Sequence, residues 1–269
     1  MPDERDRNAE AEQDLEAALE SVDDDGEVDP AFYRHGGVSL SESEREVLGD
    51  LQGRRVLVIQ GMTGEDALSL KNLGADVTVV DDEEALAPAV ELAAAAGVKI
   101  EFVEDDPGDI GVRFRTGTFD VAYSGFAAIE WIPSLSDWAS GISAALKPGG
   151  KLVVYDEHPF SKVFGEGGDS EEHLFVASSY FGEVSDWEDD DPEATGESDD
   201  DDPGPELEGP TWTLGDIVNA VGSNGMAVVS LREFPESDRY ETSIDGLPDV
   251  DYDEASRIPA VMLLVAVKL

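Results

Sequence analysis

The sequence contains no cysteine, and its three histidines, His35, His158 and His173, lie far apart along the chain. The missing thiols exclude disulfides, thiolate nucleophiles and zinc–thiolate sites, and we expect no metal centre. Basic residues are scarce, because 17 Lys and Arg stand against 63 Asp and Glu, which gives a formal net charge of −46. A surface that binds nucleic acid needs clustered Lys and Arg, and an anionic membrane repels an acidic chain, so we expect neither as a partner.

Long apolar segments are missing as well. The longest apolar run, residues 260–267, is far shorter than the roughly 20 residues of a membrane-spanning helix. The first residues are charged and lack the apolar core of a signal peptide, so we expect a cytoplasmic protein. Hydrophobic residues nevertheless make up 41% of the chain, which is enough for a folded core.

The acidic residues crowd the periodic segments too, as in residues 81–97. A charge this large destabilises a compact chain by self-repulsion unless salt screens it. The screening length falls from about 10 Å at about 0.1 M salt to about 3 Å at about 1 M. Only 6 of the 17 basic residues are lysine. This composition predicts a halophilic protein, and the alternative is a protein with acidic tails.

Two segments lack the apolar periodicity of folded elements. Residues 1–30 are polar and predict an acidic N-terminal arm without fixed structure. Residues 183–208 hold 14 Asp and Glu among 26 residues and predict an acidic insertion that cannot bury itself. The rest of residues 31–269 is interpreted as one domain.

Strands and helices alternate through the first part of that domain. This alternation predicts βαβ units and a parallel sheet with right-handed crossovers. A late helix and two late strands predict a final antiparallel hairpin. The predicted strands are residues 55–60, 76–80, 99–103, 119–124, 151–155, 226–234 and 260–268, and the predicted helices begin near residues 41, 64, 83, 134 and 214.

The first predicted strand ends in a turn that contains glycines, residues 60–65 (QGMTGE). Nucleotides bind at such turns, where a doubly wound sheet presents its carboxyl edge. Gly61 and Gly64 would let the backbone approach a ligand closely. The spacing is not Gly-x-Gly-x-x-Gly, and no Gly-Lys-Ser/Thr follows, so neither a pyrophosphate cradle nor a phosphate loop is predicted. A tight turn without a ligand is the alternative.

Acidic residues follow the second and third predicted strands. Asp81 lies about 20 residues past the turn, where a carboxylate can accept hydrogen bonds from both hydroxyls of a ribose. Asp82 is predicted to cap the helix that follows. A carboxylate within residues 104–106 can accept from an adenine amino group, although acidic residues are frequent throughout this chain.

The ordered series of motifs resembles the class I S-adenosylmethionine (SAM)-dependent methyltransferases. Residues 57–70, LVIQGMTGEDALSL, are similar to a branch that reads Leu-His-Leu-Gln-Cys-His-x-Gly-x-Asp-x-Leu-Ser. Residues 119–160 resemble its fourth strand, Trp-Leu-Pro segment, Leu-Lys-Pro-Gly-Gly turn and His-Pro-Phe. The resemblance covers roughly residues 32–269. It implies a Rossmann-like three-layer α/β sandwich with a mostly parallel seven-stranded sheet and an antiparallel last strand. It also implies SAM as the cofactor and methyl transfer to a small molecule.

The resemblance also implies roles for individual residues. Asp81 would bind the ribose, Asp106 the adenine, and Ser124 the methionine end. Tyr123 and Trp131 are expected to wall the acceptor pocket, with core packing as the alternative. His158 is expected on the acceptor side as a base, with a purely structural histidine as the alternative. The expected cofactor-binding residues are Gln60, Gly61, Gly64, Asp81, Asp106 and Ser124.

The chain departs from the expected pattern at three positions. Val58 stands where the superfamily usually has an acid inside the first strand, and Gly61 and Met62 replace the Cys and His of this branch. These changes leave open a catalytically degenerate SAM-binding protein with a regulatory or scaffolding role. A different nucleotide-binding enzyme, such as an NAD-dependent dehydrogenase, is a third hypothesis. Gln60 and Met62 stand where a dehydrogenase would have glycines, which disfavours it.

Overall fold

The computed structural model describes residues 13, 17, 29–60, 63–105, 110–114, 117–165, 175–176, 178–181, 212–240, 242 and 257–269. The predicted acidic insertion lies outside the described residues, as does nearly all of the predicted N-terminal arm. Gly61, Met62 and Asp106 also lie outside them. Helix α2 (Pro30–Arg34) is the first helix whose bounds are described, and Asp29 is its N-cap.

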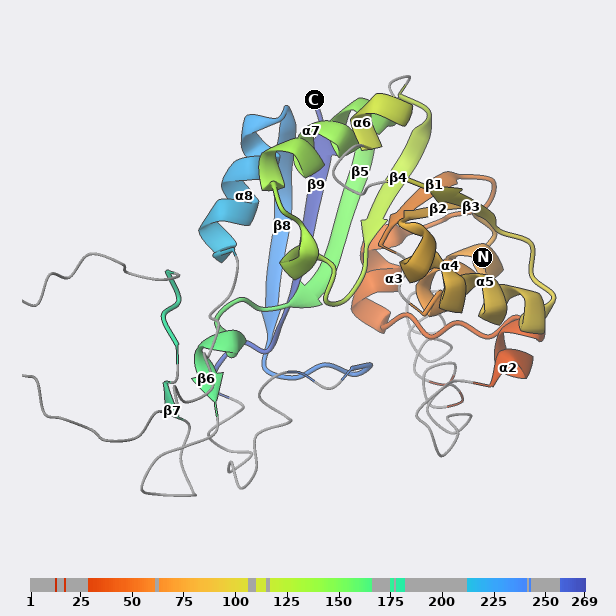
Figure 1. Cartoon of the computed structure of the whole chain (residues 1–269), viewed down its shortest axis with the longest axis horizontal. Helices are drawn as coiled ribbons and strands as arrows, with labels where there is room; N and C mark the ends of the chain where they lie inside the picture. Colours follow the sequence, from red (N-terminus) through yellow and green to blue (C-terminus); the bar gives the residue numbers. More distant parts are fainter. Residues whose placement is uncertain are drawn as a thin grey trace, which may run out of the picture.

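Seven strands form one sheet in the order β3-β2-β1-β4-β5-β9-β8 (Figure 1). The first five pair in parallel, whereas β9 runs antiparallel to both β5 and β8. The predicted Rossmann-like sheet, mostly parallel with an antiparallel last strand, is confirmed. The strands are β1 (Arg55–Ile59), β2 (Asp76–Asp81), β3 (Glu101–Glu104), β4 (Phe119–Ser124), β5 (Leu146–Glu157), β8 (Met226–Phe234) and β9 (Val261–Lys268).

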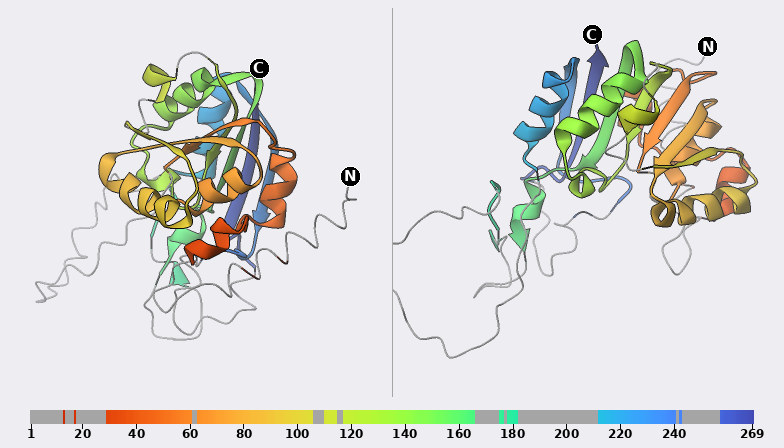
Figure 2. Two further views of the ribbon diagram at one scale, coloured as in Figure 1. Left: turned by 90° about the vertical axis from the view of Figure 1, so that its right-hand side faces the viewer. Right: turned by 45° about the horizontal axis from the view of Figure 1, so that its top comes forward.

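Helices cover both faces of this sheet (Figures 1 and 2). One face carries α6 (Ile110–Arg113), α7 (Leu135–Ala145) and α8 (Leu214–Ser223). The other carries α3 (Glu42–Leu48), α4 (Glu65–Asn72) and α5 (Glu83–Ala96), with α2 packed against α5. Beyond the carboxyl edge lie two short 3-10 helices, η1 (Ile129–Trp131) and η2 (Ser161–Val163), and a small ribbon of β6 (Phe164–Gly165) and β7 (Phe175–Val176).

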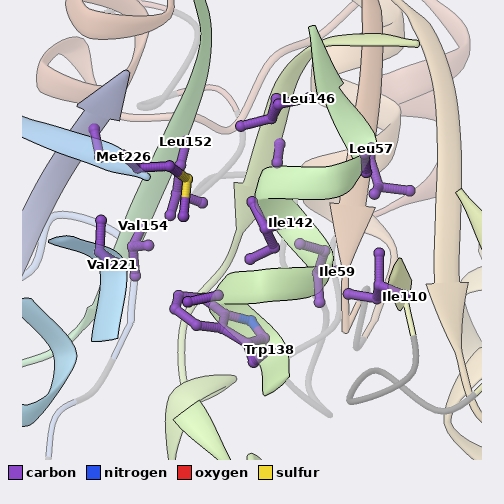
Figure 3. Packing of buried hydrophobic residues seen from close by; sticks show 14 of the residues in the cluster. Leu57, Ile59, Ile110, Trp138, Ile142, Leu146, Leu152, Val154, Val221 and Met226 are labelled. Atoms are coloured by element: carbon purple, nitrogen blue, oxygen red, sulfur yellow. The ribbon is translucent and has the colours of Figure 1, made fainter. Parts of the chain in front are cut away.

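Alternate residues of each strand enter the two cores. In β1, Leu57 and Ile59 pack toward α6 and α7, where Trp138 is wholly buried (Figure 3). Val56 and Val58 pack toward α3 and α4. Because both faces of the strand are covered, its sequence is a continuous apolar run rather than an alternating one.

Local capping signals in the sequence set several helix ends. Ser41 and Glu44 form a reciprocal capping box at the start of α3. The Ser134 hydroxyl caps α7, and Gly97 ends α5 in the left-handed conformation with a φ of 70°. The helix starts predicted near residues 41 and 134 are confirmed.

The strand predicted at residues 151–155 begins earlier in the structure, and the Pro-Gly-Gly turn of residues 147–150 lies within it. Strand β5 already pairs with β4 at Leu146, opposite Phe119, and resumes pairing at Lys151, opposite Val121. Residues 147–150 therefore form an irregularity inside β5 and do not precede the strand.

None of the helices in the described part of the chain combines the length and the apolar composition of a membrane-spanning helix.

Candidate cofactor and active site

A cleft of about 1170 Å³ opens at the carboxyl edge of the parallel strands. Its walls come from Gln60 and Thr63 after β1, from residues around the start of α5, from Glu104 and Asp105, and from the loop after β4. The strand order changes direction between β1 and β4. Ligands of open α/β sheets bind at such switch points, so this cleft is the candidate site.

The turn after β1 is shaped by two residues with positive φ. Gln60 has a φ of 55° and Gly64 a φ of 88°. A Cβ atom on Gly64 would lie 2.7 Å from the Cα of Ala89 in α5, so glycine is needed here for the close approach of α4 to α5. The buried Oε1 of Gln60 has no hydrogen-bond partner among the described residues. Gln60 is also one of the residues that line the cleft.

The two adjacent acids at the end of β2 have separate tasks. Asp81 is 4% exposed and lines the cleft, and its Oδ1 accepts a hydrogen bond of 3.0 Å from the Asp82 N–H. Asp82 Oδ1 accepts from the Ala85 N–H at 2.9 Å and caps α5, as predicted. Asp81 thus presents a carboxylate to the cleft at the position predicted to bind a ribose.

The cleft lining is acidic. Its described residues include six carboxylates and no Lys or Arg. This lining disfavours phosphate groups and favours a ligand with positive charge. The six are Asp81, Asp82, Glu83, Glu84, Glu104 and Asp105.

The end of β4 sends neighbouring residues to opposite faces. Ser124 is wholly buried, and its hydroxyl has no hydrogen-bond partner among the described residues. Tyr123 packs in the core on the α3 and α4 face, where its hydroxyl donates to Glu44 Oε1 at 2.5 Å. The expectation that Tyr123 walls the acceptor pocket is therefore wrong, because strand alternation turns it away. Trp131 lines the cleft and is 71% exposed.

His158 follows β5, and polar groups lie near both of its ring nitrogens. Nδ1 accepts a hydrogen bond from the Phe160 N–H at 3.0 Å. Nε2 lies 2.9 Å from Glu233 Oε1, which is close enough for an ion pair, but the two groups are not aligned as a hydrogen bond. Burial lowers the pKa of His158, and the Glu233 carboxylate opposes that shift. Because Nδ1 accepts a hydrogen bond and Nε2 faces Glu233 of β8, the contacts of His158 favour the structural alternative, in which the ring joins the end of β5 to β8.

A buried ionic cluster surrounds Arg239 and was not among the predicted site residues. Its guanidinium lies 2.7 Å from Glu44 Oε1 and pairs with Asp66 Oδ1, and the Arg239 side chain is 2% exposed. Burial alone would lower the pKa of Arg239, but the Asp66 and Glu44 carboxylates raise it well above its usual value. The cluster joins α3, α4 and the segment after β8. No local signal reveals it, because 195 residues separate Arg239 from Glu44.

A second missed residue is Asp156, a buried acid near the end of β5. Its carboxylate accepts hydrogen bonds from three backbone N–H groups, two of them in the loop after β4.

Within the described residues, no group of three or more His, Cys, Asp and Glu could hold a metal ion.

Part of the chain matches a known protein family. Residues 56–150 match the family described as Methyltransferase domain. This stretch runs from β1 to the irregularity in β5 and includes the cleft residues that follow β1 to β4. No curated protein matches the chain.

Solved structures with the same fold are numerous. An S-adenosylmethionine-dependent methyltransferase from Mesorhizobium loti is 23% identical with a TM-score of 0.59, covering 84% of this chain and 96% of its own. One from Methanosarcina mazei is 16% identical with a TM-score of 0.52, covering 86% and 98%. The cyclase SpnF is 17% identical with a TM-score of 0.51, covering 84% and 77%. The chain thus has the fold of SAM-dependent methyltransferases, and its match to the methyltransferase domain over residues 56–150 implies SAM as the cofactor.

Proposed function

We propose that this protein is a SAM-dependent methyltransferase that acts on a small-molecule acceptor. The observation that carries the proposal is the cleft at the switch point of the sheet. Asp81 lies buried at the tip of β2, and the described lining has no cationic side chain. SAM brings a ribose for Asp81 and a net positive charge for the acidic lining, so the residues present fit it.

Two orphaned polar atoms support the same fit. Gln60 Oε1 and Ser124 Oγ are buried without hydrogen-bond partners among the described residues. They lie at the ends of neighbouring strands: Gln60 directly follows β1, and Ser124, the last residue of β4, lies opposite Ile59. Leaving such groups unpaired is unfavourable, and the amino-acid end of SAM offers both donors and acceptors. Gln60, which lines the cleft, would hold that end, and Asp81 would hold the ribose. Ser124 is proposed as a second partner of that end, although it is wholly buried and is not among the lining residues.

The protein's part in the reaction is alignment more than acid–base chemistry. When bound, SAM supplies a methyl group that its sulfonium already activates. The rigid strand ends fix Asp81, Gln60 and Ser124, which would orient the cofactor for in-line attack by the acceptor. We expect His158 to have a structural role and not to act as a base. The exposed ring of Trp131 offers a face on which an acceptor can stack at the rim of the cleft.

The dehydrogenase alternative is disfavoured by charge. A dinucleotide carries two phosphates, which need backbone donors at a helix N-terminus or cationic side chains. Here the first turn of α4 holds Glu65 and Asp66, and six carboxylates line the cleft. Catalytic degeneracy remains the second candidate, since the buried Val58 provides no carboxylate within β1.

Measurements of ligand binding and of turnover distinguish the methyltransferase from the dehydrogenase and from the catalytically degenerate protein. In molar KCl, we expect SAM and its demethylated product to raise the thermal midpoint, and NAD and NADP to leave it unchanged. Stabilisation by NAD in place of SAM would contradict the proposal. Incubation with SAM and a panel of small hydroxyl and amine acceptors, followed by detection of the demethylated product, then tests turnover. SAM binding without turnover on any acceptor would favour the degenerate protein.

A further inference from the structure

The loop after β4 forms one wall of the cleft and has little regular structure of its own. It supplies five of the fifteen lining residues, namely Ala127, Ala128, Trp131, Ile132 and Pro133. Ala127 has a φ of 59°, a left-handed conformation that a residue with a side chain rarely adopts. A loop of this kind holds one shape only if neighbouring elements fix it.

Asp156 fixes the middle of this loop through its backbone. The carboxylate is 3% exposed. Oδ1 accepts from the Ala127 N–H at 2.6 Å and from the Glu157 N–H at 2.7 Å, and Oδ2 accepts from the Ile129 N–H at 2.9 Å. Two of these three donors belong to the loop and flank Ala128, so the carboxylate holds both sides of the strained turn.

Other contacts hold the loop at its ends. Phe126 stacks on Tyr240 with ring centroids 4.5 Å apart. The Ile132 carbonyl accepts from the Trp212 indole at 2.8 Å. Neither contact reaches the amides of residues 127 and 129, which Asp156 alone satisfies among the described hydrogen bonds.

We propose that Asp156 is a positioning residue for the cofactor, which sets the shape of the cleft wall without touching SAM. The inference rests on the proposed function and names a further residue of the same site. Asp156 belongs to β5, which lies inside the sheet between β4 and β9, so its hydrogen bonds anchor the loop to the rigid sheet. A wall displaced by a fraction of an ångström would loosen the fit of the ligand.

Protonation of Asp156 should weaken this hold. Burial raises the pKa of Asp156 to about 7, against the lowering by its three amide donors and by Lys162. The charged group that acts on it is Lys162 of η2, which in turn pairs with Glu130 and Glu157. A protonated carboxyl carries a hydrogen on one oxygen, and that oxygen becomes a weaker acceptor for the amides that it serves. The wall is therefore held best above the pKa, and its hold weakens as the pH falls through about 7.

The test compares Asp156→Asn with Asp120→Asn, measuring SAM affinity by calorimetry in molar KCl. Asp120 is a matched control because it also accepts a backbone hydrogen bond, from Arg55, but it lies at the opposite end of β4. We expect SAM to bind Asp156→Asn roughly 10- to 100-fold more weakly, and Asp120→Asn as tightly as wild type. Wild-type affinity should fall between about pH 8 and about pH 6, whereas that of Asp156→Asn should stay constant.

Equal SAM affinity of wild type and Asp156→Asn, or identical pH profiles, would overturn the positioning role alone. If SAM does not bind wild type at any pH, the proposed function fails together with this inference, so the two failures are distinguishable. Should Asp156→Asn not fold, the wild-type pH series decides, because constant affinity across that range contradicts the proposal.

Discussion

At the scale of single residues, the polar groups that shape this protein are the buried ones. Arg239 is the clearest case, since two carboxylates and the Tyr240 hydroxyl surround a guanidinium that is almost fully buried. A buried pair of this kind is not by itself evidence of high stability. Removal of one partner, however, leaves the other charge unpaired in a low-dielectric interior, which is costly. The cluster ties the first turn of α4, directly after the cofactor turn, to α3 and to the chain after β8.

We predict that Arg239→Met lowers the free energy of unfolding by about 3–5 kcal/mol, because Glu44 and Asp66 are left buried without their cation. Arg232→Met is the matched control. Arg232 pairs with Glu46, but both side chains are more than a third exposed, at 38% and 57%. An exposed pair contributes about 1 kcal/mol or less. Urea unfolding in molar KCl measures the stability of both variants. Similar losses of unfolding free energy for the two would show that the buried cluster contributes no more to stability than the exposed pair.

At the scale of elements, the start of α4 packs closely against α5 at Gly64. We predict that Gly64→Ala destabilises the fold by about 2–5 kcal/mol, since it combines an unfavourable φ with overpacking against Ala89. It should also weaken SAM binding, because the turn lines the cleft.

Gly97→Ala separates the two causes of that loss. Gly97 has a φ of 70°, but nothing lies within 4 Å of an added Cβ. We expect a loss of about 1–2 kcal/mol with unchanged SAM affinity. Unfolding curves and calorimetry on both variants test this, and equal losses would mean that backbone strain alone explains the need for glycine at position 64.

Elements of this fold were predictable where one strong local signal governs them. Strand β4 and helix α5 have the predicted bounds, because an apolar strand and a capped, glycine-terminated helix leave little choice. The start of β5 was misplaced, since the turn at residues 147–150 lies within a strand that begins earlier. Propensity alone does not show that β-pairing continues across such a turn.

The site was predictable only in part, for reasons that differ between residues. Asp82 was assigned as a cap because an acid directly before a helix has a local meaning. The face that Tyr123 takes follows from strand alternation and could have been read from the sequence. The Asp156 contacts could not, because its loop partners are backbone amides, which every residue except proline carries. The partners of Arg239 are likewise set by tertiary packing alone.

At the scale of the whole molecule, the net charge of −46 dominates. We predict a cooperative fold in molar KCl and loss of structure near 0.1 M, because charges then repel one another over about 10 Å instead of about 3 Å. Circular dichroism across a KCl series measures this. Unchanged spectra down to the lowest salt concentration would contradict the prediction of a halophilic protein.

The most direct test of the whole account is calorimetry of SAM binding to wild type, Asp81→Ala and Asp82→Ala in molar KCl. Loss of charge-assisted hydrogen bonds to the ribose should weaken SAM binding to Asp81→Ala by about 1.5–3 kcal/mol, roughly 10- to 150-fold. Asp82→Ala should bind SAM as tightly as wild type and lose only about 1 kcal/mol of stability through its helix cap. Equal SAM affinity of wild type and Asp81→Ala would contradict the assignment of this cleft to the cofactor.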